Sequence, residues 1–330
     1  MGRMIDGEWY TDAEQLDRSD DGEFRRAETS FRNRITADGA YPAEPGRYHL
    51  YISRACPWAH RTTIARTLLG LEHTISVDVV APVREDRGWE FDPAVDGCGP
   101  DTVNGADYLH KVYAMADPEY TGRVTVPVLW DRETETIVNN ESAEIVRMFD
   151  DAFDDHARND VSLVPEAERE AVDRTVDELY EPINNGVYRA GFAGSQRAYE
   201  RAVERLFAAL ERWEGVLEDQ RYLCGERFTA ADVFLFTTLY RFDEVYHTHF
   251  ACNVAPLESY PNLWNFTREV FQLPGVEQTC NMTHVKEHYY RSHTELNPRR
   301  LVPVGPDPEF GASHDRDRLA GEPPVARRGE

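Results

Sequence analysis

Residues 51–61 read Tyr-Ile-Ser-Arg-Ala-Cys-Pro-Trp-Ala-His-Arg, and they place Cys56 where a strand passes into a helix. Residues 48–53 have a strand pattern, and Pro57 suits the first helical position because an N–H group there would lack a partner in any case. Cys56 is therefore expected at the N-cap, where free backbone N–H groups and the positive end of the helix dipole favour a thiolate. Cysteine pKa values at such positions fall to roughly 3.5–7.5. Position 59 is alanine, so Cys56 has no Cys-x-x-Cys partner, and a disulfide formed on it must be resolved by an outside thiol.

The composition indicates a two-domain protein with an acidic surface. The 330 residues carry a net charge of −24, from 60 acidic and 36 basic residues, and only Lys111 and Lys286 are lysines. So acidic a chain is unsuited to nucleic acid or to an anionic membrane as a partner. We interpret the charge as a solvated acidic coat, typical of proteins from a high-salt cytoplasm.

The location expected from the sequence is cytoplasmic. The chain has no apolar run of 18 residues, so no membrane span is expected. Its N-terminus is polar and acidic, without the apolar region of a signal peptide. The five cysteines lie at no paired spacing, which suits a reducing compartment.

Residues 47–155 have the element order of a thioredoxin-like α/β domain. A strand, a helix, a second strand, a hairpin of two strands and a final helix are expected at residues 48–53, 57–70, 74–80, 124–130, 136–139 and 141–153. A long polar insertion occupies residues 82–121. The charged residues 1–46 are interpreted as an N-terminal extension.

Residues 156–293 are predicted to form a second, all-helical domain, because strand patterns stop and helical periodicity takes over. The expected helices cover residues 166–188, 195–218, 229–248 and 261–273. Thr229-Ala-Ala-Asp232, before an apolar run, indicates an N-terminal capping box. Residues 294–330 are interpreted as a tail whose last 20 residues, rich in proline and charge, are expected to be disordered.

Two further segments indicate a binding site for a peptide thiol beside Cys56. Pro127 opens a strand and is expected to follow a cis bond, which would leave the backbone of Val126 able to pair with a bound peptide. An ordinary edge-strand proline is the alternative. Glu141 and Ser142 begin the next helix, where the amides and the Ser142 hydroxyl suit a carboxylate and Glu141 suits an ammonium group. Together these features match the α-amino-acid end of a γ-glutamyl peptide, whereas the helix start alone would be a plain cap.

These segments resemble the glutathionyl-hydroquinone reductases, the xi class of the omega-like glutathione transferases. The resemblance covers residues 30–306 and rests on motifs at residues 54–61, 88–91, 123–131, 139–145, 183–192 and 288–293, with Asn297-Pro298. It implies the glutathione transferase fold, in which a thioredoxin-like N-terminal domain precedes an all-helical domain. It also implies a homodimer, the common state of the class.

The resemblance implies roles for individual residues. Cys56 would be the nucleophile, and Tyr188 the proton donor and acceptor near the quinol oxygen. Tyr246 and Tyr289 would point their hydroxyl groups at the Cys56 sulfur and help to lower its pKa. The thiol peptide would be held by seven residues, namely Trp89, Arg123, Val124, Thr125, Val126, Glu141 and Ser142.

Several of these residues have alternative interpretations. Each tyrosine could be a core residue with a polar tip, with Tyr240 and Tyr290 as competing candidates, and Trp89 could simply pack within the insertion. His284 and His288 lie four apart on a helix but lack a second pair of ligands, so no metal site is predicted. The remaining cysteines lack a proline-flanked helix start and are expected to be inert: Cys98, Cys224, Cys252 and Cys280.

The sequence thus predicts reduction of glutathionyl-hydroquinones through a mixed disulfide on Cys56, with no bound cofactor. The co-substrate would be glutathione or γ-glutamylcysteine, because both share the γ-glutamyl and cysteinyl parts that the site would hold. A second hypothesis is an omega-like thiol transferase or dehydroascorbate reductase acting on mixed disulfides, which needs Cys56 but neither Tyr188 nor Tyr289. A third is a non-catalytic binding module with the transferase fold, which the intact set of Cys56, Pro127 and Glu141-Ser142 argues against.

Overall fold

The computed structural model describes residues 2–11, 16–36 and 38–324, which form two compact units. The first unit contains the described residues of Met1–Gln15, Glu28–Arg158 and Thr279–Val302. The second unit contains those of Leu16–Ala27, Asn159–Gln278 and Pro303–Glu330. No helix among these residues is long and apolar enough to cross a bilayer.

A four-stranded sheet forms the centre of the first unit, in the order β4-β3-β5-β6. Its strands span Tyr48–Ile52 (β3), Ser76–Val79 (β4), Val128–Asp131 (β5) and Thr136–Asn139 (β6). β3 pairs in parallel with β4 and antiparallel with β5, and β5 pairs antiparallel with β6. All five residues of β3 are buried, as expected of a strand inside a sheet that is covered on both faces.

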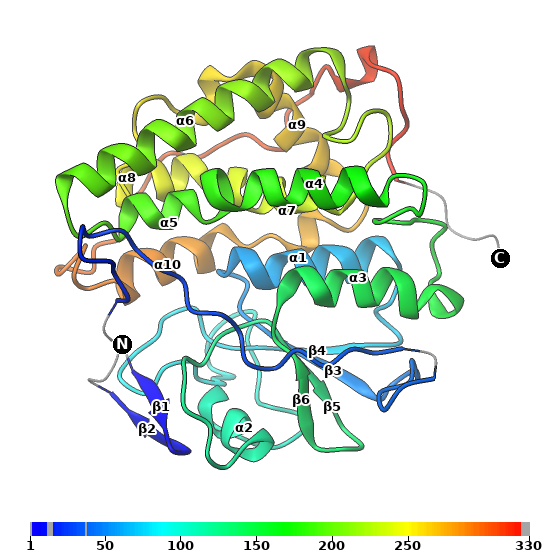
Figure 1. The fold of residues 1–330 in the computed structure, drawn as a ribbon, viewed down its shortest axis with the longest axis vertical. Coiled ribbons are helices and arrows are strands. Elements are labelled where there is room, and N and C mark those ends of the chain that lie inside the picture. The colour runs from blue at the N-terminus through cyan, green and yellow to red at the C-terminus, as the bar shows by residue number, and fades with distance from the viewer. Residues whose placement is uncertain (1, 12–15, 37, 325–330) are drawn as a thin grey trace. The chain divides into compact units, whose positions relative to one another are not determined.

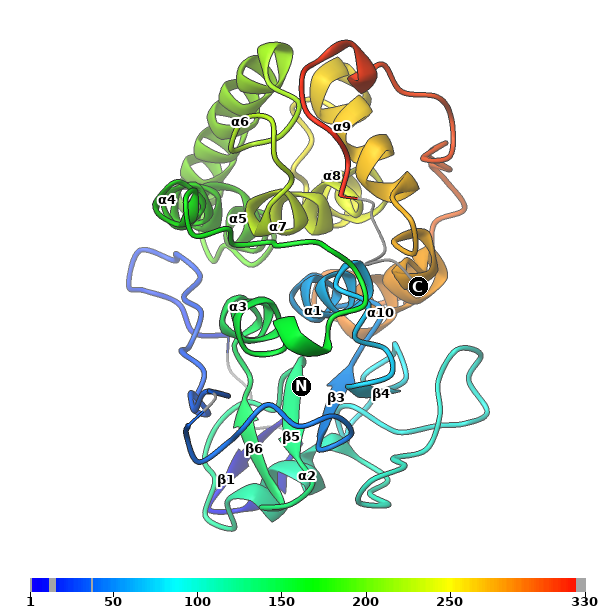
Figure 2. The same cartoon turned by 90° about the vertical axis from the view of Figure 1, so that its right-hand side faces the viewer.

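Helices cover this sheet. α1 (Pro57–Leu68) packs against α3 (Ser142–Ala152), and Figures 1 and 2 show the strands lying between this pair and α2 (Leu109–Ala116). α10 (Met282–Ser292) also belongs to the unit, and β1 (Arg3–Ile5) and β2 (Glu8–Tyr10) form a separate two-stranded sheet. The arrangement confirms the predicted thioredoxin-like domain.

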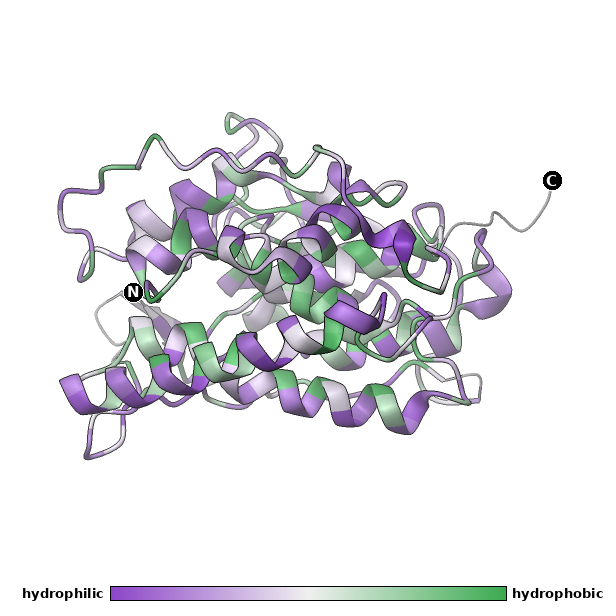
Figure 3. Cartoon of the chain, turned by 90° about the horizontal axis from the view of Figure 1, so that it is seen from above, coloured by the Kyte–Doolittle hydropathy of each residue, from purple (hydrophilic) through white to green (hydrophobic). Residues whose placement is uncertain are grey.

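Helices make up the second unit. They are α4 (Arg169–Leu179), α5 (Gly186–Gly191), α6 (Gln196–Asp219), α7 (Ala230–Leu239), α8 (His247–His249) and α9 (Pro261–Gln272). All ten residues of α7 are buried, so α7 is the central helix, and its start carries the predicted capping box of Thr229 and Asp232. α6 is amphipathic instead, with buried residues recurring three or four apart from Ala198 to Leu217. Figure 3 shows hydrophilic and hydrophobic residues alternating along such helices.

Two π-helical turns interrupt helices that the sequence predicted to be continuous. Tyr180–Asn184 lies between α4 and α5, and Phe242–Tyr246 lies between α7 and α8. The predictions of single helices over 166–188 and 229–248 were wrong in this respect. A π turn is one residue longer than an α turn and barely alters the apolar pattern, so the sequence gives little sign of it. Short 3-10 turns lie at Asp154–His156, Leu257–Ser259, Glu277–Thr279 and Arg316–Arg318.

The two units differ from the expected domains near both ends of the chain. α10 groups with the sheet unit, whereas residues 16–27 and the tail from residue 303 group with the helical unit. The expected disorder of the last 20 residues was wrong for residues 311–324, which the structure describes. There Arg316 is fully buried and donates a hydrogen bond of 2.6 Å to the carbonyl oxygen of Leu217. Residues 325–330, also expected to be disordered, lie outside the described residues.

Candidate active site

Cys56 occupies the N-cap of α1, as the sequence predicts. Its backbone is extended (φ −77°, ψ 122°), Pro57 follows in the first turn, and its carbonyl oxygen accepts a hydrogen bond of 3.0 Å from the N–H of His60. The sulfur is half-buried and lies 3.6 Å from the carbonyl oxygen of Val126. The Val126–Pro127 bond is cis, which confirms the cis bond predicted before Pro127. The cysteine therefore lies beside the backbone segment that was expected to bind a peptide.

Two tyrosines of the insertion hold that segment in place. The hydroxyl of Tyr113 donates to the carbonyl oxygen of Thr125 at 2.8 Å and accepts from the N–H of Thr125 at 3.2 Å and from the side-chain amide of Asn140 at 3.1 Å. The hydroxyl of Tyr120 donates to the carbonyl oxygen of Arg123 at 2.8 Å. Burial raises the pKa of Tyr113 and raises that of Tyr120 to about 12, so both hydroxyls remain donors near neutral pH. The sequence predicts a role for neither tyrosine, because their hydrogen-bond partners depend on how the insertion folds back.

The start of α3 carries the other predicted part of the peptide site. Glu141 is the N-cap, and its carboxylate accepts a hydrogen bond of 3.3 Å from the N–H of Ala143. Ser142 is buried, and its hydroxyl oxygen accepts from the guanidinium of Arg61 at 3.4 Å. Arg61 is itself buried, so its charge adds to the positive end of the α3 dipole, where the sequence predicts that a carboxylate binds. Arg61 ends the cysteine motif, but nothing local in the sequence ties it to α3.

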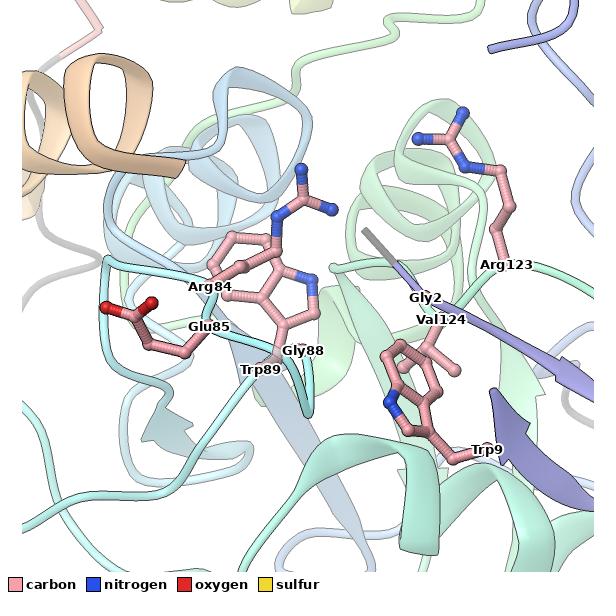
Figure 4. A pocket seen from close by; sticks show the side chains of 8 residues that line it. All are labelled: Gly2, Trp9, Arg84, Glu85, Gly88, Trp89, Arg123 and Val124. Atoms are coloured by element: carbon pink, nitrogen blue, oxygen red, sulfur yellow. The ribbon is translucent and has the colours of Figure 1, made fainter. Parts of the chain in front are cut away.

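Three further predicted residues line one pocket. Trp89, Arg123 and Val124 share it with Gly2, Trp9, Arg84, Glu85 and Gly88. Trp89 is buried, and its ring stacks on that of His288 with the centroids 5.0 Å apart. In Figure 4, Arg84 and Arg123 come from opposite sides of the pocket and their guanidinium groups point in the same direction. The lining therefore carries two arginines, two aromatic rings and the acidic Glu85, whose carboxylate pairs with Arg300.

The predicted tyrosines are divided between the units. Tyr289 lies on α10 in the same unit as Cys56, and its ring meets the ring of His293 edge-on. Tyr188 and Tyr246 lie in the helical unit with their ring centroids 6.0 Å apart. Tyr188 follows the first π turn and Tyr246 ends the second, and such turns are frequent at functional sites. The action of these hydroxyls on the Cys56 sulfur stays a prediction.

The remaining cysteines lie in other environments. Burial raises the pKa of Cys98 to about 11 and also raises the pKa of Cys224 and of Cys252. Those three thiols stay protonated near neutral pH, which agrees with the expectation that they are inert. The sulfur of Cys280 lies 3.7 Å from Nε2 of His60.

His284 and His288 both make contacts with backbone. Nε2 of His284 is 2.7 Å from the carbonyl oxygen of Asp96, and Nδ1 of His288 is 2.7 Å from that of Pro82. Across residues 2–11, 16–36 and 38–324 there is no group of three or more His, Cys, Asp or Glu side chains that could hold a metal ion.

Comparison with known proteins agrees with this geometry. The family model for the glutathione S-transferase N-terminal domain matches residues 55–152, and that for the glutathione S-transferase C-terminal domain matches residues 196–269. The chain is 47% identical to the glutathionyl-hydroquinone reductase YqjG of Escherichia coli K12, over 96% of this chain and 99% of that protein.

Solved structures show the same likeness. The Xi class GST from Natrialba magadii has a TM-score of 0.92 and 54% identity and covers 98% of both chains. The glutathione-bound structure of YqjG has a TM-score of 0.88 and 45% identity, covering 96% of this chain and 99% of that one. The shared fold, together with close to half of all residues being identical over nearly the whole length, leaves one conclusion: the chain belongs to the glutathione S-transferase family.

Proposed function

We propose that this protein reduces glutathionyl-hydroquinones to hydroquinones, with glutathione or γ-glutamylcysteine as co-substrate. The proposal is carried by the Cys56 sulfur, which lies at the N-cap of α1 and 3.6 Å from the carbonyl oxygen of Val126. A thiolate is favoured there, and alanine at position 59 leaves an outside thiol to resolve any disulfide that forms. The name of the relative YqjG, a glutathionyl-hydroquinone reductase, supports this choice of substrate.

The reaction transfers the peptide sulfur from a ring carbon to Cys56. The ring first tautomerises to a ketone, and the Cys56 thiolate then attacks the thioether sulfur. The carbon–sulfur bond breaks, its electron pair leaves with the ring, and the ring takes up a proton to become the hydroquinone. A second peptide thiolate attacks the peptide sulfur of the mixed disulfide, which releases the oxidised dimer and restores the Cys56 thiolate. Two thiols thus supply the two electrons, and no bound cofactor is required.

Tyr188 is proposed to move the proton during tautomerisation. A phenol and a hydroquinone have similar pKa values, so a proton passes between them at little cost in free energy. Tyr246 and Tyr289 are proposed to donate hydrogen bonds to the Cys56 sulfur, which would favour its charged form. The contact between the rings of Tyr188 and Tyr246 supports a shared site within the helical unit.

The peptide part of the substrate is proposed to bind along one edge of the first unit. Its α-amino and α-carboxyl groups would bind at Glu141 and Ser142, and its cysteinyl backbone would pair with Val126. The hydroxyl of Tyr113 supports this arrangement, because it bonds both to Asn140, just before α3, and to Thr125, just before Val126.

A steady-state assay with a glutathionyl-hydroquinone at molar salt tests the proposal, with each thiol supplied in turn. We expect Cys56→Ser to abolish hydroquinone release and Cys98→Ser, the matched control, to retain it. Release by the Cys56→Ser variant would contradict the proposal. If Tyr188→Phe left turnover unchanged, the general thiol transferase or dehydroascorbate reductase activity would be favoured instead.

Two broader properties also stay proposals. We propose a homodimer, which light scattering tests, and a cytoplasmic location. The location is supported by the five cysteines, none of which forms a disulfide in the described part of the chain.

A further inference from the structure

The pocket beside the peptide site contains two side chains that the preceding sections give no role. Arg84 lies in the insertion and Trp9 lies on β2, and both line the pocket with Trp89, Arg123 and Val124. Figure 4 shows the guanidinium groups of Arg84 and Arg123 flanking the pocket and the indole of Trp9 near Val124.

Contacts along its whole length hold Arg84 in position. Its backbone N–H donates to the hydroxyl oxygen of Ser292 at 3.0 Å, and its guanidinium lies 5.2 Å from the ring centroid of Trp89. The Trp89 ring stacks in turn on the ring of His288, whose Nδ1 is hydrogen-bonded to the carbonyl oxygen of Pro82. A guanidinium held over an aromatic ring loses less freedom on binding, and its N–H groups match the geometry of a carboxylate.

Trp9 is held equally firmly. Its Nε1 donates to the carbonyl oxygen of Asp86 at 3.0 Å, and its ring stacks on His110 with the centroids 4.9 Å apart. Gly88 approaches the indole so closely that a Cβ there would lie 2.9 Å from a ring carbon. The N-terminal strand is thereby fixed to the insertion, and Trp9 forms part of the pocket wall.

The pocket lies at a suitable distance for the C-terminal end of a bound peptide. Val124, in its lining, is two residues before Val126, a span of at most roughly 7 Å along the chain. A glycine after the cysteinyl residue of the peptide would extend the ligand by about 3.6 Å. Glutathione has this glycine and carries its carboxylate there, whereas γ-glutamylcysteine ends at the cysteinyl residue.

We propose that Arg84, together with Arg123, binds the glycine carboxylate of glutathione and that Trp9 closes the pocket around the glycine, so that the site prefers the tripeptide to γ-glutamylcysteine. This inference rests on the proposed function and identifies which thiol the site prefers. Arg84 and Trp9 are specificity-determining residues that do not touch the reacting sulfur. The N-terminal extension, through Trp9, thereby becomes part of the site.

Equilibrium binding of unreactive ligands tests the inference, by titration calorimetry in moderate salt. The ligands are S-methylglutathione, its glycine amide and S-methyl-γ-glutamylcysteine. We expect the unmodified protein to bind S-methylglutathione about 10-fold more tightly than either other ligand. Arg84→Gln should remove most of that preference by weakening S-methylglutathione alone, and Arg84→Lys should restore part of it. Arg87→Gln is the matched control, because Arg87 is exposed in the same loop and lies over Tyr108 instead.

Equal weakening of all three ligands by Arg84→Gln, or equal effects of Arg84→Gln and Arg87→Gln, would overturn the inference. Trp9→Phe provides an independent variant and should also narrow the preference between the tripeptide and the dipeptide. The measurement involves no hydroquinone chemistry, so a failure here is distinct from a failure of the proposed reaction, which Cys56→Ser tests.

Discussion

The hydroxyl of Tyr113 donates a hydrogen bond of 2.8 Å to the carbonyl oxygen of Thr125. The phenol oxygen of Tyr113 also accepts a hydrogen bond from the side-chain amide of Asn140, two residues before α3. One buried phenol therefore joins the two segments proposed to bind the peptide. A single side chain of the insertion therefore joins the segments that carry the proposed γ-glutamyl and cysteinyl subsites.

Tyr113→Phe should weaken peptide binding and reduce stability together. The change leaves the Thr125 carbonyl and the Asn140 amide without this partner in a buried position, at a cost of about 2 kcal/mol in the free energy of unfolding. We expect the KM for the thiol to rise while the kcat for hydroquinone release changes little. Urea unfolding and steady-state kinetics measure the two effects. Tyr108→Phe is the control, since its hydroxyl bonds to the side chain of Glu90 at 3.2 Å and not to the proposed peptide site. A KM shift as large as that of Tyr113→Phe would contradict the proposed role of Tyr113.

Local sequence signals predicted the parts of the site that depend on neighbouring residues. The N-cap position of Cys56 and the capping box at Thr229 each follow from chemistry within a few residues. The cis bond before Pro127 was predicted from the thioredoxin-like setting of that proline. The thioredoxin-like order of elements was equally visible, because strand and helix periods alternate along residues 47–155.

Contacts between distant segments could not be predicted in this way. Tyr113 and Thr125 are twelve residues apart, and Arg61 and Ser142 are 81 apart, so their pairing depends on the folded chain. The grouping of α10 with the sheet unit has the same origin, since a helical period does not show which surface a helix packs on.

Arg26→Gln should slow the proton transfer assigned to Tyr188. The guanidinium of Arg26 lies 4.7 Å from the ring centroid of Tyr188 and its Nε donates to the side chain of Asn185 at 2.9 Å. A cation over the ring stabilises the negative charge that forms on the phenol oxygen when it gives up its proton. We expect kcat to fall about fivefold, corresponding to ~1 kcal/mol, with an unchanged KM for the thiol. The alkaline limb of the pH profile of kcat should move to higher pH.

Arg25→Gln is the matched control for that change, because Arg25 is the exposed neighbour of Arg26. Identical pH profiles for the two variants would show that Arg26 has only a structural role.

Glu144 should make the stability of the first unit depend on pH under acid conditions. Its hydrogen bonds from Arg32 lower its pKa from 4.5 to about 2, with a further contribution from Asn139. A carboxyl with a lowered folded pKa contributes its full stabilisation above its unfolded pKa, here above pH 4.5, and loses it as the pH falls toward 2. Since Arg32 is half-exposed, we expect the contribution to be about 1 kcal/mol.

Unfolding of the protein and of Glu144→Gln, followed by fluorescence from pH 7 to pH 2.5, measures this dependence. The stability difference between the two should be constant above about pH 5.5 and should shrink below pH 4.5. Glu119→Gln, at an exposed loop position, should show no such convergence. A constant difference between the protein and Glu144→Gln throughout the range would disprove the assignment.

Arg316→Met should destabilise the helical unit, although Arg316 lies in a tail that the sequence predicts to be disordered. The guanidinium is fully buried and donates to the carbonyl oxygens of Leu217, Gln220 and Arg221, which lie at and just beyond the C-terminal end of α6. Carbonyl groups at a helix end need partners when buried, and a cation is favoured there by the helix dipole. Methionine fills similar space but leaves these carbonyls without the hydrogen bonds from Arg316, so we expect a loss of about 3 kcal/mol in the free energy of unfolding.

Arg318→Met, in the same 3-10 turn, is the control because it removes a half-exposed arginine, and it should lower the free energy of unfolding far less. Urea unfolding followed by far-UV circular dichroism compares the two variants, and equal stabilities would mean that the tail does not support α6.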